Sequence, residues 1–166
     1  MRAAIALGSN LGDRRENLKR ALEHIRSMAM ARPPILVSSI YETEPVDCAP
    51  DAPLFLNAVV EIDYLEQPMH LLTCLGEIED SLGRPRIHER NAPRTIDLDL
   101  LYFGNVMLSI VHLQLPHPRM FQRRFVLEPL AEIRPDFVPA GKAQDVATLL
   151  RNLPETTPLV RVATEW

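Results

Sequence analysis

An alternation of residue types between Thr95 and Tyr102 constrains this chain more than any other feature. Every second residue in this stretch is apolar: Ile96, Leu98, Leu100 and Tyr102. Period-two alternation is typical of a β-strand with one face in the core. Asp97 and Asp99 therefore share the opposite face, with Cα atoms roughly 6.5–7 Å apart at about 3.3 Å per residue.

Two aspartates on one strand face need a compensating charge, because aspartate is a poor strand former and like charges repel. A divalent cation with oxygen ligands would offset the repulsion. Four arginines precede the pair, at positions 84, 86, 90 and 94. Carboxylates that hold Mg²⁺ beside guanidinium groups that hold phosphate predict a nucleoside triphosphate site. The alternative is a solvated edge strand beside a charged loop, and the arginines favour the site.

Composition limits the class of protein. The 166 residues, 46% hydrophobic and 24% charged, suit one globular domain spanning 1–166. A net charge of −4 offers no basic field for nucleic acid or an anionic membrane. No apolar run reaches the roughly 20 residues of a membrane span, and the N-terminus lacks a signal-peptide pattern. Cys48 and Cys74 fit neither a disulfide framework nor metal-ligand spacing. We expect a cytoplasmic protein.

The basic residues are almost all arginine. Lys19 and Lys142 are the only lysines among 18 basic residues. Genome composition is one explanation of this bias. Phosphate binding is the other, since a fixed guanidinium fork suits phosphate, and a second arginine group follows at positions 119, 123 and 124.

The order of expected elements predicts the fold class. Strands are expected at 3–7, 35–43, 55–63 and 95–103, with helices after the first (from Asp13 to Met28) and the third (68–82). This β-α-β-β-α-β order matches the ferredoxin-like split βαβ motif, an α/β (α+β) fold with a mainly antiparallel sheet. We expect both helices on one face and the two aspartates on the other, open face. Further expected elements are two short strands in 106–115, a helix in 119–133 broken at Pro129, a short helix near 146–150 and a strand at 160–162.

Three other segments carry weaker signals. The loops 44–54 and 83–92 lack apolar anchors and are predicted to be mobile lids over the aspartate face. The turn from Gly8 to Gly12 is interpreted as a connection. Phe55 and Asn57 share a strand face and could grip a flat heteroaromatic ligand, although a solvated strand face explains them as well.

The segment Arg90–Leu101 resembles the signature of the 6-hydroxymethyl-7,8-dihydropterin pyrophosphokinases of folate biosynthesis. Similar segments occur in order along most of the chain: 7–12, 41–45, 55–58, 116–117 and 123–127. The likeness fades after about Phe137. The resemblance implies transfer of pyrophosphate from ATP to the pterin hydroxymethyl group, with release of AMP.

The resemblance also implies roles for the charged residues. Asp97 and Asp99 would hold two Mg²⁺ ions, and Arg84 and Arg94 would neutralise phosphate charge during transfer. The remaining implied ATP-binding residues are Arg86, Arg90, His117 and Arg123.

Other residues would hold the pterin. The implied contacts are the backbone of Thr43, Glu44 and Val46, the side chains of Phe55, Asn57 and Phe125, and the space near Gly8. Phe55 and Phe125 would sandwich the ring while Asn57 binds its polar edge.

Three positions depart from the family pattern: Asn91, Pro118 and Asp47. An aromatic residue, a tyrosine and a glycine, respectively, are common there. These departures concern loop closure and part of the ATP contact, not the reaction.

Other functions remain open at this point. A two-metal nucleotidyltransferase also uses an Asp-x-Asp strand but releases pyrophosphate. An RNA-recognition sheet would need exposed aromatics and a basic face. A small-molecule regulatory domain is the third alternative. We expect small-molecule substrates and a monomer, with a dimer as the alternative.

Overall fold

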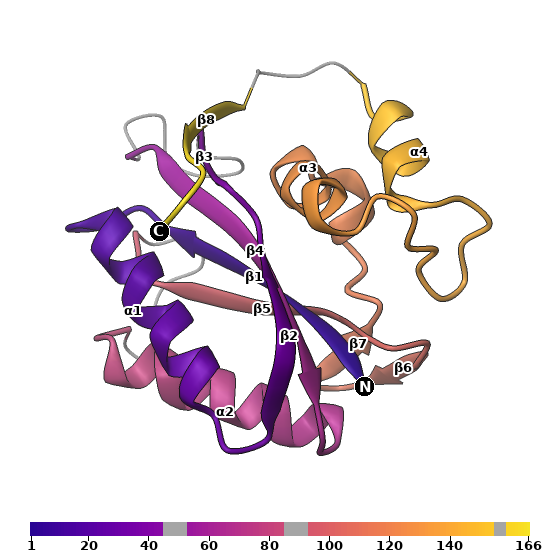
Figure 1. Ribbon diagram of the computed structural model, residues 1–166, viewed down its shortest axis with the longest axis horizontal. Coiled ribbons are helices and arrows are strands. Elements are labelled where there is room, and N and C mark those ends of the chain that lie inside the picture. Colours follow the sequence, from indigo (N-terminus) through magenta and orange to yellow (C-terminus); the bar gives the residue numbers. More distant parts are fainter. Residues whose placement is uncertain (45–52, 85–92, 155–158) are drawn as a thin grey trace.

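The computed structural model describes residues 1–44, 53–84, 93–154 and 159–166. Within these ranges a six-stranded antiparallel sheet lies between two layers of helices (Figure 1). The strands of the sheet are β1 (Arg2–Ser9), β2 (Ala31–Val37), β3 (Ile40–Thr43), β4 (Phe55–Tyr64), β5 (Asp97–Phe103) and β8 (Val160–Ala163). The helices are α1 (Arg14–Ser27), α2 (Pro68–Ser81), α3 (Arg124–Ile133) and α4 (Val146–Arg151), with a 3₁₀ turn at Met120–Gln122. A separate hairpin joins β6 (Leu108–Ile110) to β7 (Leu113–Leu115).

The strand order confirms the ferredoxin-like prediction. The sheet runs β5-β1-β4-β3-β8, and β2 also pairs with β4. Both β1 and the β2–β3 segment are antiparallel to β4, which separates them, so β1, α1 and β2 form a split βαβ unit. The segment β4-α2-β5 forms the second unit around β1.

The main core lies between the sheet and helices α1 and α2, which cover one face in Figure 1. Ile5 and Leu7 of β1 point into it, and the buried stripes of the helices meet them there. Burying each such aliphatic side chain contributes roughly 1.5–3 kcal/mol. No helix in the described ranges is long and apolar enough to cross a membrane.

The opposite face is not open, and this part of the prediction was wrong. Helix α3 packs on it and α4 packs against α3, around a second apolar cluster that includes Val59, Val126 and Leu130. The small side chains of Ala4 and Ala6 in β1 leave room for this layer. Asp97 and Asp99 lie on the same face, and their side chains are 21% and 38% exposed.

A β-bulge corrects the predicted face of Tyr102. Ala4 pairs with Tyr102 while Ile5 pairs with Leu100, so Leu101 is an extra residue in β5. The insertion shifts the alternation by one position. Tyr102 therefore points away from Leu98 and Leu100 and packs on Phe137, with ring centroids 4.3 Å apart.

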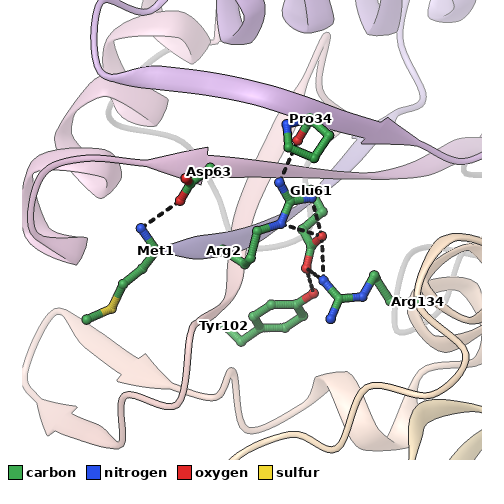
Figure 2. Close-up of polar contacts among 7 residues, drawn as sticks. All are labelled: Met1, Arg2, Pro34, Glu61, Asp63, Tyr102 and Arg134. Atoms are coloured by element: carbon green, nitrogen blue, oxygen red, sulfur yellow. Dashed lines mark hydrogen bonds and ion pairs between the residues drawn. The ribbon is translucent and has the colours of Figure 1, made fainter.

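A buried carboxylate ties three strands to α3. Glu61 of β4 has no exposed surface and accepts hydrogen bonds from Arg2 of β1, Tyr102 of β5 and Arg134 beyond α3 (Figure 2). The Arg2 Nε–Oε2 distance is 2.8 Å, and Arg134 Nη1 lies 2.6 and 2.8 Å from the two oxygens. Arg2 also donates to the carbonyl of Pro34, 2.5 Å away. The cluster fixes β1, β4 and β5 relative to one another.

Prolines interrupt the secondary structure less than the sequence suggests. Pro33 and Pro34 lie inside β2, where the pairing with β4 is irregular between Arg32 and Leu36, so the strand begins before them. The predicted strand 35–43 is instead divided at Ser38–Ser39 into β2 and β3. Pro129 lies buried inside α3, and the break in the helix falls at the extended residue Arg123.

The last strand of the sheet comes from the end of the sequence. β8 pairs antiparallel with β3 through Ile40, Tyr41 and Glu42. Arg161 donates to the Tyr41 hydroxyl at 3.2 Å, and Trp166 Nε1 donates to the Ser38 carbonyl at 2.8 Å.

Candidate functional site

Gly8 lies at the junction of three strands and of the residues predicted to bind ligands. It pairs with Asn57 of β4 on one side and Asp97 of β5 on the other. A Cβ atom at Gly8 would lie 3.4 Å from Asn57 Oδ1, 3.8 Å from Phe55 Cδ1 and 3.8 Å from Asp97 Cβ. A larger residue at Gly8 would therefore fill the space that Phe55, Asn57 and Asp97 surround.

The Asn57 side chain is held in one orientation. It is almost fully buried, and its Nδ2 donates to Thr43 Oγ1 at 2.8 Å. This bond leaves Oδ1 as the acceptor nearest Gly8. Phe55, two residues earlier, lies under the Arg94 guanidinium, which is 5.2 Å from the ring centroid. The structure thus brings together the aromatic–amide pair and an arginine from the predicted phosphate set.

Asp97 is paired with two arginines. Arg84 Nη1 lies 2.5 Å from Oδ1, and Arg94 Nη2 lies 2.8 Å from Oδ2. These two guanidinium groups supply part of the positive charge near the aspartates that was expected from a divalent cation.

Asp99 is less well compensated. Its nearest described cation, Arg123 Nη1, is 3.7 Å from Oδ2. Burial and the Asp97 carboxylate raise the pKa of Asp99, while His117, Arg123 and Arg119 act to lower it. The negative charge of Asp99 is less well neutralised than that of Asp97, so an added cation would be stabilised beside the pair.

His117 presents a hydrogen-bond donor beside Asp99. Its backbone N–H donates to the Leu101 carbonyl at 2.7 Å, which fixes the residue against β5. Its Nδ1 accepts from the Arg119 N–H at 3.2 Å, which assigns the proton of the neutral ring to Nε2. Burial lowers the pKa of His117, the charges of Arg123 and Arg119 lower it further, and Asp99 opposes them. Because its pKa lies below the usual value, the ring is mainly neutral at pH 7.

A cavity of about 280 Å³ adjoins Asp99 and His117. Its lining combines leucines of α2, β5 and β7 with polar side chains of β7 and the segment after it: Leu72, Leu98, Leu100, Leu113, Gln114 and Arg119. The sequence did not predict this cavity, because alternating leucines such as Leu98 and Leu100 indicate a core-facing strand. Pro118, one of the departures from the family pattern, also lines it.

The segment Ser9–Asn10, interpreted above as a connection, supports the site. Asn10 N donates to the Arg94 carbonyl at 3.1 Å, and Arg94 N donates to Asn10 Oδ1 at 2.8 Å. Ser9 Oγ donates to the Thr95 carbonyl at 2.5 Å. Both side chains are buried. These bonds hold the backbone from which Arg94 extends, and the signal for them was a pair of small polar residues directly after a buried strand.

Several of the predicted residues fall outside the described ranges, and two more lie at or near the ends of secondary-structure elements. Val46, Arg86 and Arg90 lie outside the described residues, as do Asp47 and Asn91 and most of both predicted lid loops. Glu44 is exposed directly after β3. Phe125 is the second residue of α3, and the Arg123 guanidinium lies 5.4 Å from its ring centroid. The sandwich of a ligand between Phe55 and Phe125 stays a prediction.

The profile of the 7,8-dihydro-6-hydroxymethylpterin-pyrophosphokinase (HPPK) family matches residues 4–135. The 2-amino-4-hydroxy-6-hydroxymethyldihydropteridine pyrophosphokinase of Bacillus subtilis is 48% identical over 131 residues, covering 79% of this chain and 77% of the relative. The protein of the same name from Pseudomonas aeruginosa is 41% identical over 142 residues, covering 85% and 86%.

A longer solved chain contains the same fold. The wild-type Plasmodium falciparum HPPK-DHPS with pteroate superposes with a TM-score of 0.70 at 15% identity, over 90% of this chain. The superposition spans 42% of that longer chain, and at this identity it concerns the fold alone. The family profile and the two bacterial relatives lead to one conclusion: this chain belongs to the HPPK family, the pyrophosphokinases of folate biosynthesis.

Proposed function

We propose that this chain transfers the pyrophosphoryl group of MgATP to the hydroxymethyl oxygen of 6-hydroxymethyl-7,8-dihydropterin and releases AMP. The observation that carries the proposal is the order of features along β5. The Phe55–Asn57 pair adjoins Asp97 through Gly8, and the cavity adjoins Asp99. A pterin and an adenosine on opposite sides of the aspartate pair would place the triphosphate across it.

The pterin end is suited to a flat, polar heterocycle. The Phe55 ring offers a stacking surface, and Gly8 leaves space beside it. Because Asn57 Nδ2 is bonded to Thr43, Oδ1 faces the ligand as an acceptor for ring N–H or amino donors. The pterin edge carries such donors.

The aspartate pair fits magnesium. Both side chains are partly exposed on one face, and the added positive charge would offset the repulsion that raises the pKa of Asp99. Mg²⁺ is usually held by one or two carboxylates together with substrate phosphates. Asp97 and Asp99 would hold two such ions, which supply charge neutralisation at the phosphates when bound.

The protein's own groups would orient the triphosphate. Arg84 and Arg94 already lie at Asp97 and can donate to phosphate oxygens there. Neutral His117 would donate from Nε2, and Arg123 would add charge beside Asp99. The apolar wall of the cavity would hold the adenine. Such a transfer depends on positioning and charge neutralisation, so the site needs no strong general base.

The nucleotide product tests the proposal. With MgATP and 6-hydroxymethyl-7,8-dihydropterin, we expect AMP formed one-for-one with a pterin bearing two phosphates, and no AMP when the pterin is omitted. ADP would indicate attack at the γ-phosphorus. Free pyrophosphate with an adenylated pterin would indicate a nucleotidyltransferase. No turnover by well-folded protein would favour a binding module.

Asn57→Ala and Arg94→Ala should affect different kinetic parameters. Asn57 contacts the pterin in ground and transition states alike, so its loss should weaken pterin affinity about 5- to 100-fold, as expected for one buried hydrogen bond, with little change in kcat. Arg94 meets charge that develops during transfer, so its loss should lower mainly kcat. Pterin binding by calorimetry and steady-state kinetics measure the two effects.

Arg20→Ala, an exposed change on α1, is the matched control for Arg94→Ala and should leave both parameters at their wild-type values. Unchanged pterin affinity in Asn57→Ala would place the heterocycle elsewhere.

A further inference from the structure

One guanidinium nitrogen of Arg84 is shared between two carboxylates. Arg84 Nη1 donates to Asp97 Oδ1 at 2.5 Å and also to Glu79 Oε1. Glu79 lies in the last turn of α2, and its side chain is only 19% exposed. No sequence pattern predicts this contact, because Glu79 resembles any acidic residue between the apolar positions of a helix.

Glu79 is bonded to the strand as well as to the arginine. Its Oε1 accepts the Leu98 N–H at 2.6 Å, and Leu98 stands between the two aspartates in β5. The Arg84 N–H donates in turn to the Glu79 carbonyl at 3.0 Å. Glu79 therefore connects the end of α2, the Arg84 side chain and the aspartate strand.

We propose that Glu79 is a positioning residue that holds Arg84 in place when Asp97 turns from the arginine to magnesium. The inference rests on the proposed function, since it assigns Asp97 to the cation. With Glu79 present, Arg84 keeps one carboxylate partner after Asp97 is withdrawn. Without the Glu79 charge, Arg84 is drawn more strongly to Asp97 and competes with the cation for it.

Glu79→Gln separates this role from simple anchoring of the strand. The amide keeps an oxygen for the Leu98 N–H and for Arg84 but lacks the charge. Glu79→Asp keeps the charge on a shorter side chain. Glu77→Gln changes an exposed carboxylate on the same helix and serves as the matched control.

The test uses an ATP analogue with a methylene group between the α- and β-phosphates, which cannot react. Calorimetry measures the affinity of this analogue over a range of Mg²⁺ concentrations. We expect Glu79→Gln to raise the half-saturating Mg²⁺ concentration about three- to tenfold, as for loss of a partly buried charge pair. Glu79→Asp should stay within about twofold of wild type on the same scale. Glu77→Gln should match wild type. In an Arg84→Ala background, Glu79→Gln should add no further shift, because the arginine carries the effect.

Two results would overturn the inference while the proposed function stands: an unchanged Mg²⁺ dependence in Glu79→Gln, or an equal shift with and without Arg84. The second result would reduce Glu79 to an anchor for Leu98. Failure of the proposed function looks different, because wild-type protein would then form no AMP from MgATP and the pterin.

Discussion

Replacing Asp99 by asparagine will lower turnover by about 100-fold or more, the size expected when a metal-mediated charge contact worth several kcal/mol is lost. The amide keeps the size of the side chain but cannot hold the cation as a carboxylate does. Among the described residues the ion-pair partner of Asp99 is Arg123, 3.7 Å away, so removal of the Asp99 charge mainly relieves repulsion from Asp97. The melting temperature of the metal-free protein should therefore stay equal or rise slightly.

Asp97→Asn should lose as much activity but behave differently in a melting experiment. Asp97 pairs with both Arg84 and Arg94, so its neutralisation leaves two arginines with weaker partners. We expect a lower melting temperature than in Asp99→Asn. AMP formation and thermal unfolding without metal measure the contrast. Full activity of either variant at ordinary Mg²⁺ concentrations would refute the metal assignment.

Glu61→Ala should give the largest loss of stability, about 3–5 kcal/mol, as for breaking a buried ion pair from one side. The substitution leaves Arg2, Arg134 and the Tyr102 hydroxyl without their shared acceptor (Figure 2). Urea denaturation measures the change in the free energy of unfolding.

Asp63→Ala is the matched control, because Asp63 lies two residues further along β4 and pairs with the N-terminal ammonium group while 39% exposed. Its loss should cost less than about 1 kcal/mol. Equal stabilities for the Glu61 and Asp63 variants would show that the buried cluster contributes little.

Local sequence pattern predicted the strands and the shared face of the two aspartates, but it failed where four apolar residues follow one another. From Leu100 to Phe103 no polar residue marks the phase of the alternation, so the bulge at Leu101 has no local signal. A helix in 119–133 was expected, but the sheet face that α3 covers depends on the small residues Ala4 and Ala6, near the start of the sequence.

In the site, too, local sequence pattern predicted some features and missed others. The shared face of Asp97 and Asp99 could be predicted because strand spacing specifies it, and Arg84 and Arg94 do lie at Asp97. The binding of magnesium and phosphate by these residues stays a prediction. Contacts such as Glu79 with Leu98, and Asn10 with Arg94, join residues 19 and 84 positions apart. Those contacts depend on how the helix and the strands are placed relative to one another, which no periodicity in the sequence records.

Strand β8 affects where the C-terminal boundary of the folded domain lies in this chain. The family profile stops at residue 135, yet β8 pairs with β3, the strand that carries Thr43. A chain shortened at the end of the profile would leave the backbone groups of β3 unpaired along one side. An uncovered strand edge is a template for joining another molecule, and aggregation is the common result. The boundary recognised by sequence similarity is thus shorter than the boundary set by the sheet.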